Sequence, residues 1–175
     1  MAAGSQQIET LEVKELTVQK FEETGAKTRT GQVYHFPARA GTQGVTGTWS
    51  TANNTGIATV AASQTAATFC IPLGLKQGDI ITSFKLSGQI ESAGGAVTVD
   101  ADLRATTAVA ADLTDASIGA ITQISKVADY LISDSKTGLS HTTISGKSYY
   151  VLLTVTTAAA TDVAIQGVEV TVTEK

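Results

Sequence analysis

The stretch FCIPLGLKQGDIITSFKLSG, Phe69–Gly88, decides the fold, because two alternating segments flank a short connection that contains glycine. Before the connection, Phe69, Ile71 and Leu73 occupy one face. After it, the even-numbered residues from Ile80 onward are mainly apolar, with Ile81 as the exception. Alternation with period two is typical of a β-strand that buries one face. We therefore expect two strands joined by a turn over residues 74–79, with Ile80, Phe84 and Leu86 on the core face.

The same alternation continues toward the C-terminus. Residues 97–104 alternate after the glycine-rich segment SAGGA, which predicts a β-hairpin with the preceding strand. Residues 147–157 predict another strand. In the last segment the apolar parity shifts at Gln166-Gly167, and this shift predicts a β-bulge.

The region between these strands, residues 105–147, is less regular. We expect strands at residues 121–127 and 130–132. A short helix is expected near residues 110–119, with Thr114 or Asp115 as its cap. The many short strands and frequent turns predict an all-β fold, an antiparallel, jelly-roll-like β-sandwich over residues 67–175.

Residues 1–66 differ in composition and are expected to form an extended N-terminal arm and an uncharged linker. Residues 41–75 contain no charged side chain and few large apolar ones, so they cannot form a core alone. We expect them to lie on the C-terminal domain, on a neighbouring copy or on a larger assembly.

Within the arm, Leu11 and Val13, then Leu16 and Val18, alternate with a slip at residues 14–15. A heptad reading fails because Glu15 stands where an apolar residue is required, so we favour an extended strand over a coiled coil. Such a strand has no hairpin partner nearby and would pair elsewhere, for example with another subunit. Together with three aromatic residues expected to anchor in a partner's pocket, these make up the predicted partner-binding set: Leu11, Val13, Leu16, Val18, Tyr34, Phe36 and Trp49.

The totals exclude several classes of protein. The net charge of −4 argues against a nucleic-acid partner, which usually meets a basic patch. No apolar run is long enough for a transmembrane helix, and the first residues do not resemble a secretory signal, so we expect no membrane partner. A single cysteine, Cys70, cannot form an internal disulfide.

Candidate chemistry is sparse, and we expect neither an enzyme nor a cofactor. Cys70 lies in a strand without a recognisable base, which favours a structural thiol over a nucleophile. The segment GLKQGD lacks the phosphate-loop pattern, and His35, His141 and Cys70 are too scattered to predict a metal site. No nucleophile-elbow motif accompanies Asp134, Ser135 and His141.

Asp100 and Asp102 share a strand face with Arg104. Their spacing is not that of a calcium loop, so a solvated face with a local ion pair is favoured over an ion site.

Four segments carry a resemblance to a known family: Ile71–Thr106, Ser148–Lys175, residues 15–41 and residues 58–69. Their Pro-Leu-Gly-Leu-x-x-Gly-Asp corner, glycine turn and final Gly-Val-Glu-Val-Thr-Val strand resemble tailed-bacteriophage structural proteins with β-sandwich domains, of the capsid decoration (cement) type. The resemblance implies a non-enzymatic virion protein on the capsid surface, assembled in the host cytoplasm. It implies the major capsid protein as partner and a homotrimer as the assembly. The alternative that it leaves open is a tail, fibre or head-spike component that binds a carbohydrate or a host receptor.

Overall fold

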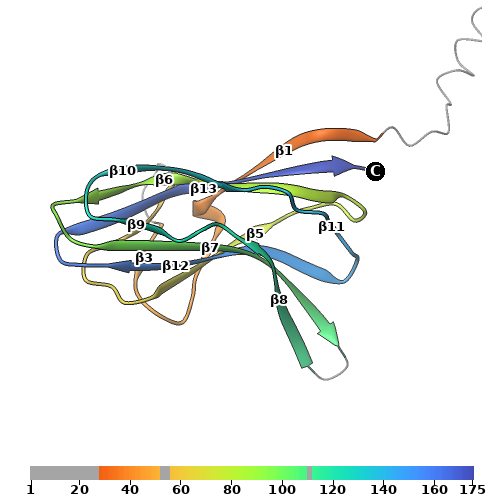
Figure 1. The fold of residues 1–175 in the computed structure, drawn as a ribbon. Coiled ribbons are helices and arrows are strands. Elements are labelled where there is room, and N and C mark those ends of the chain that lie inside the picture. The colour runs from red at the N-terminus through yellow and green to blue at the C-terminus, as the bar shows by residue number, and fades with distance from the viewer. Residues whose placement is uncertain (1–27, 52–55, 110–111) are drawn as a thin grey trace, which may run out of the picture.

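The structure is a computed structural model that describes residues 28–51, 56–109 and 112–175, so that Leu11, Val13, Leu16 and Val18 lie outside the described residues. Two antiparallel sheets pack face to face and form a β-sandwich (Figure 1). The predicted fold class is confirmed.

The first sheet, sheet A, has the strand order β10-β6-β13-β4-β3. Two further strands belong to this sheet but lie outside that order: β1 pairs with β13, and β11 pairs with β6. The bounds are β1 Arg29–Pro37, β3 Trp49–Ser50, β4 Ala58–Val60, β6 Ile80–Ser92, β10 Tyr130–Lys136, β11 His141–Thr142 and β13 Thr161–Glu174.

The second sheet, sheet B, has the order β2-β5-β12-β7-β8, with β9 also paired to β7. Its bounds are β2 Thr42–Gln43, β5 Ala67–Leu73, β7 Val97–Val109, β8 Asp112–Ala120, β9 Ile124–Lys126 and β12 Lys147–Thr157. A single 3₁₀ turn, η1, covers Ala38–Ala40 between β1 and β2.

The core lies between the sheets and is filled by the alternate apolar residues of the long strands. Phe69, Ile71 and Leu73 are buried, whereas Cys70 is half-buried on the outer face of β5, as the alternation predicted. The turn over residues 74–79 is also present, and Gly78 takes a positive φ of 92° there. The largest fully buried side chains are Phe69, Phe84, Ile71, Ile81, Leu86, Ile90, Leu103, Ile132, Leu153 and Ile165.

The predicted bulge in the last strand is confirmed. The pairing of β13 with β6 shifts register between Ile165 and Gly167. At the same point β13 changes its other neighbour, from β4 at Ile165 to β1 at Gly167. A Cβ atom on Gly167 would overlap the carbonyl oxygen of Phe36, so the close approach of β1 requires glycine.

A second register shift, between Thr171 and Val172, corrects the prediction for the start of β6. Ser83 pairs with Thr171 and Ile81 with Val172, so Thr82 is an extra residue in β6. The bulge turns Ile81 into the core and leaves Ile80, the expected core residue, only half-buried.

The predicted hairpin between residues 80 and 104 is wrong in its pairing. Its two strands and its turn at Gly94 are present, but β6 belongs to sheet A and β7 to sheet B. The connection is therefore an arch between the sheets, a jelly-roll-like feature that recurs between β12 and β13. Alternation fixes which face of a strand is buried but not which strand lies beside it.

The helix expected near residues 110–119 is also wrong. Residues 112–120 form β8, which pairs with β7 as a hairpin from Asp102↔Ala120 to Val109↔Asp112. Two strands were expected after it. The first, expected at residues 121–127, is the shorter β9, and the second, expected at residues 130–132, is the longer β10.

The sandwich also begins earlier than the charge distribution predicted. Strands β1, β3 and β4 belong to sheet A, and β2 belongs to sheet B, so residues 29–60 contribute to both layers. In the described part of the uncharged segment, β4 pairs with β13 and β2 with β5, so this part lies on the C-terminal domain, the first of the three expected supports. Small residues such as Ala38, Ala58 and Ala67 let it pack closely without many large apolar side chains.

Candidate interaction surfaces

The chain enters the sandwich through β1, which places two of the predicted anchor residues. Tyr34 and Phe36 are half-buried and pack against the core from the edge of sheet A. The Tyr34 hydroxyl donates a hydrogen bond to the Glu174 carboxylate. This bond, with the nearby charge of Lys76, lowers the pKa of Glu174. These contacts fasten β1 to the end of β13.

The third predicted anchor, Trp49, is buried within this chain and is 7% exposed. Its ring lies against Phe69, with centroids 4.8 Å apart. Trp49 was expected to anchor in a partner's pocket, but its ring is buried in the core of its own chain. The reason is that the linker supplies β3 and β4 to sheet A, which carries the ring over the core.

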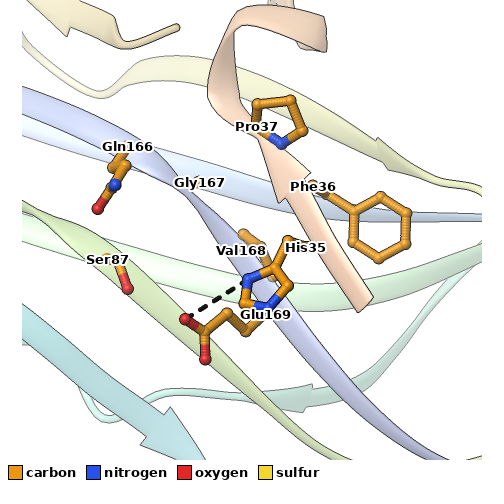
Figure 2. Close-up of a pocket in the computed structure, with 8 residues that line it drawn as sticks. All are labelled: His35, Phe36, Pro37, Ser87, Gln166, Gly167, Val168 and Glu169. Carbon is orange, nitrogen blue, oxygen red and sulfur yellow. Dashed lines mark ion pairs between the residues drawn. The ribbon is translucent and has the colours of Figure 1, made fainter. Parts of the chain in front are cut away.

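A shallow depression lies where β1 crosses the bulge of β13 (Figure 2). His35 of β1 and Glu169 of β13 face each other there, with 3.7 Å between Nδ1 and Oε1. Phe36 points away from them toward the core. The His35 side chain is 70% exposed, so this pair is solvated and is not arranged as a nucleophile with its base.

The outer face of sheet B carries a polar network. The Arg104 guanidinium lies 2.6 Å from Asp102 Oδ2 and 2.8 Å from Asp115 Oδ2. The Asp100 carboxylate instead accepts two hydrogen bonds from the Gln123 amide, at 2.9 and 3.0 Å. The local ion pair predicted from the sequence is present, and both carboxylates considered as ion ligands have donors from this chain.

One end of the sandwich carries a groove that the sequence did not reveal. It has a volume of about 360 Å³ and lies between the β7–β8 hairpin and residues 139–141; we call it the end groove. Figure 1 shows the hairpin projecting from the sandwich toward the same end as β11 and the C-terminus. The lining residues are Ala105, Thr107, Thr114, Ala116, Ser117, Ile118, Leu139, Ser140, His141 and Lys147.

The hairpin that forms one wall of the end groove is itself exposed. Leu113 on β8 is 75% exposed. The segment TTAVAADLTDA reads as helical by composition, and the only signal for a hairpin is its run of β-branched residues beside residues 97–104.

His141 contacts Tyr149 at this end. The Tyr149 hydroxyl accepts a hydrogen bond from the Ile144 amide at 2.9 Å and lies 3.4 Å from His141 Nε2. Burial, and then the charge of Lys147, lower the pKa of His141. The imidazole is therefore held mainly neutral at pH 7.

The described residues contain no group of three histidine, cysteine or acidic side chains that could hold a metal ion. Asp134, Ser135 and His141 do not form a triad, since Asp134 accepts from Tyr130 and His141 contacts Tyr149. Burial raises the pKa of the Cys70 thiol, as expected for a structural cysteine. Within the described ranges, no helix is long and apolar enough to cross a membrane.

No protein-family model and no curated protein matches the chain. Among solved structures, the CBM22-1–GH10 modules of endo-1,4-β-D-xylanase 10B from Clostridium thermocellum, solved with xylohexaose, are similar over 85% of this chain, with 16% identity and a TM-score of 0.46. A family two carbohydrate esterase from Cellvibrio japonicus is similar over 85% of this chain, with 9% identity and a TM-score of 0.38.

A CBM4 structure is similar over 82% of this chain and 86% of its own length, with 12% identity and a TM-score of 0.39. This chain spans 28% of the xylanase chain and 35% of the esterase chain.

Proposed function

We propose that this chain is a non-enzymatic capsid decoration protein of a tailed phage, which binds the major capsid protein through residues 1–27, the N-terminal segment. The observation that carries the proposal is the position of β1. It pairs with β13 on one side and has no strand on its other side within the described residues. An open strand edge presents N–H and C=O groups to which a strand of another protein can pair.

The placement of the attachment features supports this role. Gln32 of β1 pairs with Val172, Val172 with Ile81, and Ile81 with His141, so the start of β1 and the end groove lie at the same end of the sandwich. The exposed hairpin with Leu113 projects at that end. A protein that binds a shell by one end leaves its other end free to face solvent.

The assignment to phage virions rests on the resemblance of the corner at residues 71–79 and of the final strand to phage structural proteins. Decoration of a shell places many copies on a repeating lattice, where modest contacts add through avidity. We propose a homotrimer, located on the virion surface and assembled in the host cytoplasm. No catalytic step is part of this proposal, because the polar groups of sheet B are paired with one another.

The test uses shells of the cognate phage that lack the decoration protein. The full chain and a chain beginning at residue 28 are added at equal concentrations, and shell occupancy is measured by gel densitometry after sedimentation. We expect the shorter chain to lose most of its occupancy. Undiminished occupancy contradicts the role of the N-terminal segment, and no binding by the full chain contradicts the capsid role. Light scattering that gives a monomer mass at every concentration contradicts the trimer.

A second candidate is a phage tail, fibre or head-spike component that binds a carbohydrate or a host receptor, and the outer face of sheet B favours it. Tyr150 lies on that face between Pro72 and Arg104 and is half-buried. Binding sites for ligands with both apolar and polar faces often combine an aromatic ring, such as that of Tyr150, with a hydrogen-bonding group, such as the Arg104 guanidinium.

A glycan array distinguishes this candidate from the first. Binding that Tyr150→Ala abolishes and that Tyr130→Ala leaves intact would support it. An array without any bound glycan would contradict the carbohydrate form of the candidate.

A further inference from the structure

The end groove lies where the core face of β7 continues past the core. Val99 and Leu103 of β7 point into the core. Ala105 is also buried, and Thr107, which continues the same face of β7, is half-buried; both line the groove. Ile118 and Leu139 add half-buried apolar surface beside them. A strip of apolar and hydroxyl-bearing side chains is thus left open where the hairpin extends past the core.

The ionisable side chains that line the end groove are all basic. Its lining includes His141 and Lys147 and no carboxylate. Lys147 forms no ion pair with any residue in the described ranges. An unpaired ammonium at the rim of an apolar strip suits an acidic peptide whose alternate side chains are apolar.

The chain itself contains a segment of this kind. Residues 8–18, IETLEVKELTV, carry three glutamates and one lysine. Their apolar residues are Ile8, Leu11, Val13, Leu16 and Val18. The charge of this segment matches the groove, and its pairs Leu11 with Val13 and Leu16 with Val18 each place two apolar side chains on one face, on either side of the slip at residues 14–15.

The distance along the chain allows the same molecule to supply this segment. His141, Ile81, Val172 and Gln32 lie in one row across four adjacent strands. Three strand spacings put the two outer residues of that row roughly 14 Å apart. The ten residues from 18 to 28 span up to about 33 Å when extended, which is more than enough.

We propose that the end groove binds residues 8–18 of the chain's own N-terminal segment. An intramolecular segment reaches a high effective concentration, so weak contacts suffice to hold it. The proposal goes beyond the capsid role and does not depend on it. If the capsid role and this proposal both hold, the end groove binds residues 8–18 in the free protein and releases them when the shell binds them more tightly.

Limited proteolysis of the full chain tests occupancy of the groove, because Lys14 and Lys20 are trypsin sites in or beside the segment. Cleavage there follows the fraction of molecules in which the segment is released. We expect Lys147→Glu to raise the cleavage rate about fivefold through lost attraction and new repulsion. Lys85→Glu, which makes the same charge change on the outer face of sheet A, should leave the rate unchanged.

A disulfide trap identifies the source of the segment. In a Cys70→Ser background, Val13→Cys is combined with Ala116→Cys in the groove or with Ser133→Cys on the outer face of sheet A. We expect an internal disulfide in a monomer for the Ala116 pair and none for the Ser133 pair. Crosslinked dimers for the Ala116 pair assign the segment to a second copy and overturn the proposal.

Equal trypsin rates for wild type and Lys147→Glu, with the fold of both verified by circular dichroism, also overturn it. Neither result alters shell occupancy by the full chain, so failure here is distinguishable from failure of the capsid role.

Discussion

Trp49 lies against Phe69 with ring centroids 4.8 Å apart and ring planes inclined by 31°. Trp49 belongs to residues 1–66, the predicted arm and linker, and Phe69 belongs to β5, within the predicted domain of residues 67–175. Their contact joins the predicted linker to the predicted sandwich domain. The Trp49 Nε1 atom is buried and has no hydrogen-bond partner among the described residues, so the ring contributes through apolar contact.

Replacing this ring should therefore destabilise the whole sandwich. We expect Trp49→Ala to lower the free energy of unfolding by about 3–5 kcal/mol, the usual cost of deleting a buried aromatic ring. Trp49→Phe should cost less than half as much, because it keeps the stack and removes the unpaired N–H group. Urea denaturation followed by far-ultraviolet circular dichroism measures both. A loss below about 1 kcal/mol for Trp49→Ala would show that the segment is not part of the core.

Truncation tests where the folded unit begins. A chain starting at residue 28 retains every strand of both sheets, so we expect its melting temperature to stay within about 3 °C of the full chain. A chain starting at residue 67 loses β1 to β4, exposes one edge of β13 and uncovers Phe69. It should not give a cooperative melt, and a cooperative melt near that of the full chain would contradict the early start of the sandwich.

Gly167 should not tolerate a side chain. A Cβ atom there meets the backbone of Phe36 and Pro37, which cannot move without detaching β1. We expect Gly167→Ala to cost about 1–3 kcal/mol, as overpacking usually does, and to speed hydrogen exchange in residues 33–37. Gly74→Ala is the matched control, because a Cβ atom at Gly74 meets nothing within 4 Å. Equal urea midpoints for the two variants would contradict the close approach.

Stability should fall in mild acid because of His141. Burial lowers the pKa of His141 in the folded chain, with a smaller effect of Lys147, below the usual value of about 6.5. The unfolded chain then binds the proton more tightly, so stability is lost as pH falls through about 6.5 toward the folded-state pKa.

The urea midpoint of the wild type should drop between pH 7.5 and pH 5.5 by more than that of His141→Gln. Lys147→Gln should reduce the drop in part, since it removes the second cause. Identical drops in wild type and His141→Gln would show that another group is responsible.

Much of the fold follows from the sequence because side-chain parity is a local property. The buried faces of β5 and β12, the turn before β6 and the bulge at Gly167 could all be predicted. Pairing could not, because it is set by long-range packing. Residues 93–96 serve an arch between sheets as readily as a hairpin, and alternation is the same in both.

The candidate surfaces were harder to predict for a related reason. The end groove depends on how far the β7–β8 hairpin outruns sheet A, a relation between segments that no local pattern encodes. Trp49 was expected to serve a partner because its neighbours are small and uncharged. The structure uses those small residues to bring the segment onto its own core.

The position of the last two strands has a consequence for biosynthesis. β12 is the central strand of sheet B and β13 the central strand of sheet A, and both follow all the other strands of the two sheets along the chain. Every earlier strand that pairs with them must wait until residues 147–174 have left the ribosome. The sandwich therefore forms only after residues 147–174 have been synthesised, and a nascent chain stopped before β12 lacks the central strand of each sheet.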